Sequence, residues 1–129
     1  MTFLKSIHHI AIICSDYQKS KHFYTAILGL EIVNETFRED RDSYKLDLSL
    51  HGQYIIELFS FPDPVKRPSG PEATGLRHLA FEVDNMEEAV AYFENHGIVV
   101  EHTRLDPMPN KKFTFFRDPD DLPIELYEV

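Results

Sequence analysis

The feature that most constrains the fold of this chain is an internal repeat with an offset of 69 residues. The segment His9-Ile-Ala-Ile-Ile-Cys aligns with His78-Leu-Ala-Phe-Glu-Val, and both read as short apolar strands. A repeated segment of this size is the signature of one supersecondary unit used twice. The chain is therefore expected to fold as two similar modules.

A helix is expected to follow the first strand of each half. It begins six residues after the histidine, at Ser15 and at Asp84, because Gln18 and Glu87 stand three residues further on at capping-box spacing. Apolar residues then recur with helical periodicity in both halves. They are Phe23, Tyr24, Ile27 and Leu28 in the first helix, and Met86, Ala89, Val90 and Phe93 in the second.

Strand-like runs fill the remainder of each half after Gly29 and Gly97, which are expected to end the helices as left-handed caps. The predicted strands cover 30–37, 43–50 and 53–61 in the first half, and 98–102, 112–117 and 122–128 in the second. The sequence thus predicts an α+β fold of two tandem βαβββ modules. They span 1–61 and 75–129 of a single domain 1–129, joined by a Pro-rich linker or lid at 62–71.

Length and charge restrict the class of partner. The 129 residues suit one compact domain, and no run approaches the ~20 apolar residues of a membrane span. A formal net charge of −9 with scattered basic residues argues against nucleic acid. One cysteine and no visible signal peptide indicate a reducing cytoplasm. A small-molecule partner is expected, without nucleic acid or membrane.

Two histidines and two glutamates occupy matching places in the repeat. Strand alternation turns His9 and His78 away from the helix layer. Glu57 follows His9 by 48 residues, Glu125 follows His78 by 47, and each glutamate sits in an otherwise apolar strand. An isolated buried carboxylate costs several kcal/mol unless a cation compensates it. The four side chains are therefore predicted to bind one divalent metal ion.

The alternative interpretation is structural for each residue taken alone, because a strand histidine usually packs and a strand glutamate usually faces solvent. The repeat favours the metal site. Two imidazoles and two carboxylates suit Ni, Co or Zn, with Mn or Fe(II) as alternatives, and an octahedral ion would keep two positions open.

The other histidines and the loop cations are not expected to belong to this site. His8 should point to the face opposite His9, and four histidines should lie on the surface: His22, His51, His96 and His102. Cys14 is expected to be a small core residue. Four cations in predicted loops should form a solvated face, with an anionic substrate as the alternative: Lys66, Arg67, Lys111 and Lys112.

With these motifs in order, the chain resembles the vicinal oxygen chelate superfamily of glyoxalase I, epimerases, extradiol dioxygenases, fosfomycin-resistance enzymes and bleomycin-binding proteins. The matching motifs are His9-Ile-Ala-Ile, Phe23-Tyr-x3-Leu-Gly-Leu, Ile56-Glu-Leu, His78-Leu-Ala-Phe and Phe116-Arg-Asp-Pro-Asp-Asp-Leu-Pro-Ile-Glu-Leu-Tyr-Glu. The resemblance implies a U-shaped mixed sheet around a metal, with helices on the outer face. It also implies ligand roles for His9, Glu57, His78 and Glu125.

The fourth ligand, Glu57, makes the resemblance closest to the glyoxalase I class. Dedicated glyoxalase I enzymes carry an arginine four residues after the first ligand and an asparagine four after the second, and both hold glutathione. Here Ile13 and Phe61 stand at those positions. Losing such charge-assisted hydrogen bonds removes about 1.5–3 kcal/mol each. A glutathione adduct is therefore expected to be a poor substrate.

The sequence thus predicts a metal-dependent isomerase, lyase or epimerase in which Glu125 moves a proton beside a polarised carbonyl or enediolate oxygen. Two alternatives stay open: an Fe(II) dioxygenase, in which Glu57 would be a bystander, and a small-molecule binding or resistance protein without turnover. The resemblance further implies a homodimer, because the superfamily pairs such modules within one chain or exchanges them between two.

Overall fold

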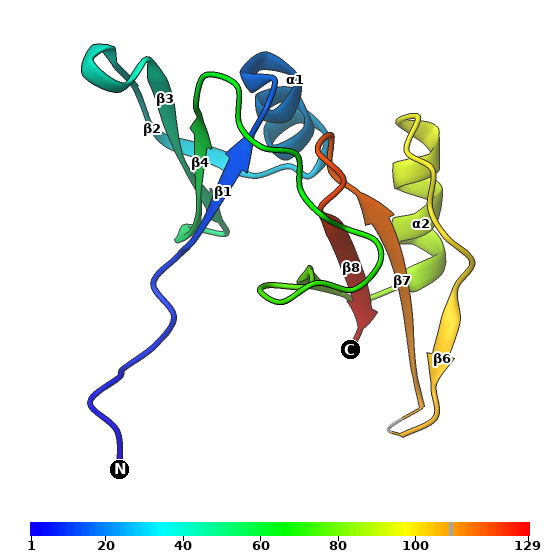
Figure 1. The fold of residues 1–129 in the computed structure, drawn as a ribbon. Coiled ribbons are helices and arrows are strands. Elements are labelled where there is room, and N and C mark those ends of the chain that lie inside the picture. Colours follow the sequence, from blue (N-terminus) through cyan, green and yellow to red (C-terminus); the bar gives the residue numbers. More distant parts are fainter. Residues whose placement is uncertain (109) are drawn as a thin grey trace. The chain divides into compact units, whose positions relative to one another are not determined.

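The computed structural model describes residues 1–108 and 110–129 and divides the chain into two compact units, Met1–Val65 and Lys66–Val129. Each unit contains a strand, a helix and three further strands in that order (Figure 1). The predicted α+β class and the tandem βαβββ modules are confirmed.

Unit 1 is a four-stranded mixed sheet with the strand order β1-β4-β3-β2. β1 pairs with β4 in parallel, and the remaining neighbours are antiparallel. The elements are β1 (Ile10–Cys14), α1 (Tyr17–His22) continued by a π-helical turn (Phe23–Ile27), β2 (Glu31–Arg38), a 3-10 turn (Glu39–Arg41), β3 (Ser43–Leu50) and β4 (Gln53–Ser60).

Unit 2 repeats this topology with the strand order β5-β8-β7-β6. Its parallel pair is β5 with β8, and the other pairs are antiparallel. The elements are β5 (Leu79–Val83), α2 (Met86–Asn95), β6 (Arg104–Asp106), β7 (Lys111–Arg117) and β8 (Pro123–Glu128).

Both helices begin one residue later than predicted. The N-cap residues are Asp16 and Asn85, whose side chains accept the backbone N–H groups of Lys19 and Glu88. The prediction of Ser15 and Asp84 was wrong because Asp and Asn themselves reach the third backbone N–H, so no capping-box glutamine or glutamate is needed. Since the shift is the same in both units, the repeat is preserved.

Both helices end at the predicted glycines. Gly29 has φ 83° and Gly97 has φ 79°, in the left-handed region where a Cβ is strained. The Ile98 N–H then donates to the Phe93 carbonyl across this turn, the closing bond of a Schellman-type cap. Each chain reversal therefore brings the next segment back toward the sheet.

Each sheet buries one face beneath its helix. In unit 1 the inner residues of β3 and β4 are fully buried, as is Tyr24 of the π-helical turn. Those strand residues are Leu46, Leu48, Ile56 and Leu58. In unit 2, Phe93 of α2 contacts Phe116 of β7 with ring centroids 4.7 Å apart. The opposite face of each sheet is left to carry the polar side chains of the candidate site.

The predicted strand 98–102 was wrong in position, because the first strand after α2 is β6, Arg104–Asp106. The Glu101 N–H still donates to the Phe115 carbonyl, but the Glu101 carbonyl accepts the Thr114 hydroxyl instead of a backbone N–H. A side chain thus takes the place of the ladder bond, and Val99 is left 88% exposed. Apolar composition alone could not distinguish this arrangement from a strand.

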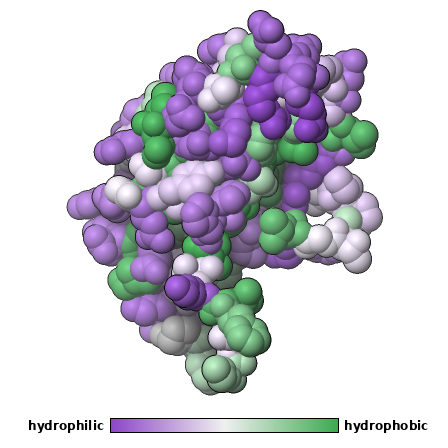
Figure 2. All heavy atoms as spheres, turned by 90° about the vertical axis from the view of Figure 1, so that its left-hand side faces the viewer, coloured by the Kyte–Doolittle hydropathy of each residue, from purple (hydrophilic) through white to green (hydrophobic). Residues whose placement is uncertain are grey.

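The face drawn in Figure 2 is mainly hydrophilic, with apolar residues in separate patches. Among the exposed apolar side chains are Phe3, Leu4 and Ile7, which precede β1. No helix in the described residues has both the length and the apolar character needed to cross a membrane.

Candidate metal centre

The first histidine and glutamate of the repeat meet in unit 1. Ala11 of β1 pairs with Glu57 of β4 in parallel register, and His9 lies two residues before Ala11 on the same side of the chain. The Nε2 atom of His9 is 3.6 Å from Oε1 of Glu57. Ile12 and Cys14, of opposite parity, are buried. Alternation therefore separates the polar face from the core as predicted, and Cys14 is the core residue expected.

The second pair meets in unit 2 in the same register. Ala80 of β5 pairs with Glu125 of β8, and His78 again lies two residues earlier. The Nε2 atom of His78 is 3.0 Å from Oε1 of Glu125. The Glu57 and Glu125 side chains are 17% and 15% exposed, so both carboxylates are largely withdrawn from water. Each therefore requires a nearby positive charge or donor.

The separations within both pairs fit ligands of one divalent ion. Two donors bonded at about 2.0–2.2 Å are about 3.0 Å apart in an octahedral site and about 3.4 Å apart in a tetrahedral site. The Nδ1 atom of His78 is also buried and has no hydrogen-bond partner among the described residues. Among the polar contacts of the described residues, the one that orients this ring is that of Nε2 with Glu125.

The described residues contain no group of three or more His, Cys, Asp or Glu side chains close enough to share a metal ion. Each unit instead brings together two of the four predicted ligands. The convergence of all four on one ion therefore stays a prediction.

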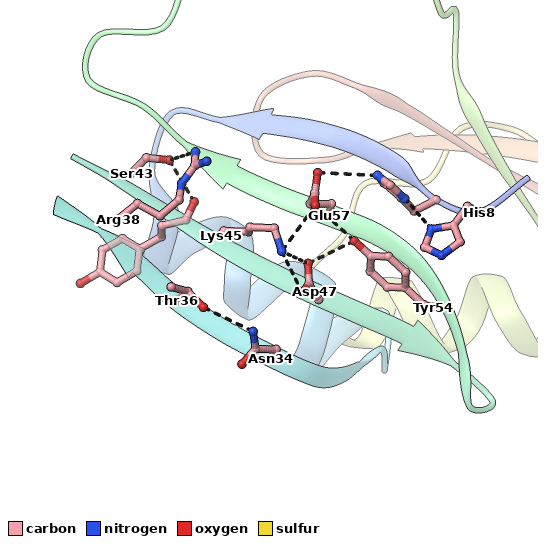
Figure 3. Close-up of polar contacts among 11 residues, drawn as sticks. His8, Asn34, Thr36, Arg38, Ser43, Lys45, Asp47, Tyr54 and Glu57 are labelled. Atoms are coloured by element: carbon pink, nitrogen blue, oxygen red, sulfur yellow. Dashed lines mark hydrogen bonds and ion pairs between the residues drawn. The ribbon is translucent and has the colours of Figure 1, made fainter. Parts of the chain in front are cut away.

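The carboxylate of Glu57 has further partners, which the sequence analysis missed (Figure 3). Lys45 of β3 places Nζ 3.5 Å from Oε2 of Glu57 and 3.0 Å from both oxygens of Asp47. The Tyr54 hydroxyl donates to Asp47 at 3.1 Å and to Glu57 at 3.4 Å. One oxygen of Glu57 thus faces His9, while the other faces a cation and a donor.

These contacts raise the pKa of two groups beside Glu57. The hydrogen bond with Asp47 raises the pKa of the Lys45 ammonium, which keeps it charged. Burial, together with the hydrogen bond to Asp47, raises the pKa of the Tyr54 hydroxyl, which keeps it a donor at neutral pH. The two carboxylates thus face a charged ammonium and a hydroxyl donor.

The corresponding positions in unit 2 are aromatic. Asp47 pairs with Glu57 across β3 and β4, whereas Phe115 pairs with Glu125 across β7 and β8. The ring of Phe115 meets the ring of His78 edge to face, with centroids 5.1 Å apart. Glu125 thus lies beside an aromatic wall where Glu57 has an ionic cluster.

His8 does not lie where alternation placed it. β1 begins at Ile10, so His8 and His9 both precede the strand, and both rings contact the ring of Tyr54 instead of pointing to opposite faces. The Nδ1 atom of His8 is 2.8 Å from Nδ1 of His9, and the His8 ring meets that of Tyr54 with centroids 5.4 Å apart. The prediction of an opposite-facing His8 was therefore wrong. The four histidines predicted for the surface are exposed.

The two positions that differ from the glutathione-binding pattern are apolar at the surface of unit 1. Ile13 is 55% exposed on the His9 face of β1. Phe61 stacks on Phe59 with ring centroids 5.7 Å apart, and the Arg38 guanidinium lies 4.8 Å from the Phe59 centroid. The side chains of Ile13 and Phe61 offer no hydrogen bond to a peptide-like ligand.

The sequence matches one known protein family and two bacterial proteins over nearly its whole length. Residues 6–126 match the family described as the Glyoxalase/Bleomycin resistance protein/Dioxygenase superfamily. The chain is 63% identical over 125 residues to uncharacterized protein YwkD of Bacillus subtilis, with 97% of this chain and 98% of that protein covered. It is 60% identical over 128 residues to uncharacterized protein YaeR of Escherichia coli (strain K12), with 99% of each covered.

A solved structure has the same fold. The crystal structure of the glyoxalase family protein from Enterococcus faecalis superposes with a TM-score of 0.91 at 48% identity, covering 98% of this chain and 100% of that chain. Lactoylglutathione lyase of Escherichia coli O157:H7 is more distant, at 29% identity over 127 residues, with 93% of this chain and 90% of that protein covered. Metallothiol transferase FosB of Staphylococcus saprophyticus is 25% identical over 126 residues, with 96% and 77% covered.

Proposed function

Because the chain belongs to the Glyoxalase/Bleomycin resistance protein/Dioxygenase superfamily, we propose that it is a divalent-metal enzyme of the glyoxalase I type. It would act on a small molecule as an isomerase, lyase or epimerase, moving a proton on the carbon next to a carbonyl or enediolate. The single observation that carries this proposal is the same His/Glu pair in the same strand register in both units, with separations of 3.6 and 3.0 Å.

In this proposal His9, Glu57, His78 and Glu125 hold one ion, with Ni, Co or Zn favoured and Mn or Fe as alternatives. A bound divalent ion would supply Lewis-acid polarisation of a substrate oxygen. The side chains have different tasks. One oxygen of Glu57 is fixed by Lys45 and Tyr54, so this residue is suited to hold its position.

Glu125 is the proposed proton-moving residue. Among the described residues its carboxylate has one polar side-chain partner within ion-pair distance, the Nε2 atom of His78. A carboxylate with one strong contact keeps lone pairs free to take a proton from carbon and return it to the neighbouring carbon. The aromatic wall of Phe115 limits water on that side, which strengthens electrostatic interactions with the reacting group.

Metal analysis of the purified full chain tests the first half of the proposal. The protein is reconstituted separately with Ni, Co, Zn, Mn and Fe(II), and we expect one ion per complete set of four ligands. A His9→Ala/His78→Ala double variant should lose that ion. A His22→Ala/His96→Ala variant, which removes two exposed histidines instead, should keep it. Equal occupancy in both variants would end the proposal.

An activity screen tests the second half. Metal-loaded protein is offered α-ketoaldehyde thiol adducts and 2-hydroxy or 2-acyl thioesters, and turnover should be lost in Glu125→Gln. The glutathione hemithioacetal of methylglyoxal should be a poor substrate because Ile13 and Phe61 are apolar. Turnover with Fe(II) and dioxygen alone would favour the dioxygenase alternative, and stoichiometric ligand retention without product would favour a binding protein.

We further propose a homodimer acting in the cytoplasm. Its two half-sites, His9 with Glu57 in unit 1 and His78 with Glu125 in unit 2, would meet within one chain or between two chains. Mixing a His9→Ala chain with a Glu125→Ala chain distinguishes these arrangements. If the two chains exchange units, each heterodimer has one site that carries both substitutions and one site that carries neither, which is intact. Random mixing should then recover about a quarter of wild-type occupancy. Mixed dimers without recovered binding would show that each chain forms its own site.

A further inference from the structure

Beside the His78–Glu125 pair, unit 2 contains a cavity of about 160 Å³. Its wall includes His78 and Phe115, which are part of the half-site described above. The volume exceeds by about tenfold the ~10–15 Å³ that one water molecule needs. The cavity is thus large enough for a small ionised group of a ligand that also reaches the half-site.

The charge of this wall is opposite to that of the protein. Four arginines line the cavity against two glutamates, in a chain whose formal net charge is −9. The arginines are Arg67, Arg77, Arg104 and Arg117. A concave surface with an excess of guanidinium groups attracts anions and binds planar or tetrahedral oxyanions in bidentate fashion.

The loop that carries two of these arginines is fixed in place. The Arg67 guanidinium donates to the carbonyls of Leu76 and Arg77 at 2.8 and 3.0 Å, and to the Ser69 hydroxyl at 3.0 Å. Ser69 in turn donates to the Asp121 carbonyl at 2.7 Å. Arg67 therefore positions this wall, and Arg77 is presented by an ordered segment.

The guanidinium of Arg77 already binds a carboxylate of the chain itself, that of Glu72. Nε and Nη2 of Arg77 donate to the two oxygens of Glu72 at 3.1 and 3.0 Å. Both side chains are well exposed, at 64% and 75%, and ion pairs of this kind are easily exchanged for another partner. Glu72 thus shows where a carboxylate-like group docks, and a ligand anion can replace it.

Arg104 provides the second available guanidinium. It lies over the rings of Phe113 and Phe115, 5.3 and 5.4 Å from their centroids, which fixes its orientation. Its Nη1 atom contacts Glu101 at 3.1 Å, again with an exposed partner. A rigid, stacked guanidinium loses little side-chain entropy when it binds an anion.

We propose that this cavity is an oxyanion subsite, and that it holds the phosphate, phosphonate or carboxylate group of the substrate whose reacting end lies at the metal centre. This inference rests on the proposed function for the identity of the reacting end, but the subsite stands on the arginines alone. The substrate class is therefore a small acid or phosphorylated metabolite.

Titration of the full chain with inorganic phosphate tests the subsite. Binding is monitored by ¹H–¹⁵N chemical shifts, with and without a metal chelator. Methylphosphonate and acetate are titrated in parallel, because their relative affinities distinguish phosphoryl from carboxyl ligands. Saturable binding in the chelator-treated protein is expected, with shifts at Arg77 and Arg104. Arg77→Gln and Arg104→Gln should each weaken it about tenfold. The spectrum itself reports whether each variant is folded.

Two further variants make the result specific. Glu72→Gln removes the competing carboxylate while keeping its shape, so phosphate should bind several-fold more tightly; a purely structural Glu72 would not give this gain. Arg41→Gln removes one exposed arginine from unit 1 and should leave the affinity within about twofold. Absence of saturable anion binding, or equal weakening by Arg41→Gln and Arg77→Gln, would overturn the subsite.

The same measurements separate this inference from the proposed function. A protein that binds phosphate but no divalent ion would overturn the metal proposal and support the subsite. A protein that binds a divalent ion, and binds phosphate only when that ion is present with no effect of the arginine variants, would overturn the subsite and support the metal proposal.

Discussion

The two half-sites share one frame and differ in what surrounds the glutamate. Both place a histidine two residues before an alanine that pairs with the glutamate in parallel register. In unit 1 the antiparallel neighbour of the glutamate is Asp47, and in unit 2 it is Phe115. Duplication thus explains the common geometry, and the difference lies on the third strand of the sheet.

The different surroundings of Glu57 and Glu125 match the different roles proposed for these two residues. Around Glu57, Lys45 and Tyr54 contact one carboxylate oxygen, and in the proposed site such contacts would orient this residue toward the ion. Around Glu125 the third strand provides aromatic surface, and the neighbouring cavity provides arginines. In the proposed function, unit 1 would anchor the ion and unit 2 would receive the reacting part of a ligand.

The largest effect should come from single ligand deletions, which test whether the two halves contribute equally to one ion. His9→Ala and His78→Ala should each weaken divalent-ion affinity about a hundredfold or more, because four ligands share a total of ~10–16 kcal/mol. Glu57→Gln should weaken it less than His78→Ala, since the amide keeps an oxygen donor. Competition with a chromophoric chelator measures the dissociation constants, with His22→Ala as the control.

If only one of the two histidine variants lost the ion, the two units would not contribute equally to one site. The ion would then belong to one unit, and the repeated His/Glu register would be structural in the other. Equal losses would support a shared site.

The second prediction concerns the connections that precede the two glutamate strands. Unit 1 uses a two-residue turn at His51 and Gly52, with φ of 50° and 79°. Unit 2 uses a longer turn in which buried Asp118 accepts the backbone N–H groups of Asp120 and Leu122 at 2.9 Å each. Asp118→Ala should therefore lower the free energy of unfolding by about 2–3 kcal/mol.

Urea denaturation measures this change, and Asp121→Asn is the matched control. Asp121 has φ 70°, a conformation that Asn also tolerates, and its carboxylate is half exposed beside Arg117. The control should shift the free energy of unfolding by no more than about 0.5 kcal/mol. A comparable loss in both variants would show that charge, rather than the buried acceptor, stabilises the turn.

A third prediction uses the first residue of each helix. Tyr17 opens α1, donates to Glu35 and stacks on Tyr44 with ring centroids 4.2 Å apart, whereas buried Met86 opens α2. Burial, together with the bond to Glu35, raises the pKa of the Tyr17 hydroxyl above its ordinary value of 10.0. The native state therefore keeps this proton above pH 10, while the unfolded chain releases it.

The contribution of Tyr17 to stability is thus complete below pH 10 and decreases as the pH rises. Between pH 9 and pH 11 the loss should be about 1.4 kcal/mol for this one group. Unfolding experiments at both pH values should show a smaller decline for Tyr17→Phe than for the wild type. Met86→Leu should leave the decline unchanged, because unit 2 has no titrating group at this position.

Most of the order of strands and helices was predictable because both halves of the sequence repeat the same pattern. Alternation places the histidines and glutamates on the face away from the core, and the left-handed glycines mark where the helices end. Both features are local, so a single sequence contains them. The capping residues were displaced by one position, since Asp and Asn can cap without the partner that the capping box assumes.

The ionic cluster of unit 1 was not predictable for a physical reason. The turn pairs Leu50 with Gln53, which by simple counting would place Asp47 opposite Ile56. A β-bulge between Leu48 and Ser49 shifts the register by one residue, so Asp47 lies opposite Glu57 instead. The signal in the sequence was the spacing of Lys45 and Asp47, two residues apart on one face, but their partner depended on the bulge.

The smallest effect should come from the hydroxyl that reaches this cluster. Tyr54 donates to Glu57 at 3.4 Å, a long hydrogen bond, and shares the proton with Asp47 at 3.1 Å. Tyr54→Phe keeps the ring contact with His9 and removes only the donor. We therefore expect divalent-ion affinity to fall by only a few-fold, below the 10–100-fold typical of a well-aligned second contact.

The matched control for this change is Tyr127→Phe in unit 2. The Tyr127 hydroxyl lies two residues after Glu125 and donates to Asp106 at 3.3 Å rather than to the glutamate. Its removal should leave the affinity unchanged in the same chelator competition. If Tyr127→Phe weakened the ion as much as Tyr54→Phe, the two glutamates would be equally supported by their neighbours. The assignment of Glu57 as the fixed ligand and Glu125 as the proton-moving residue would then lose its basis.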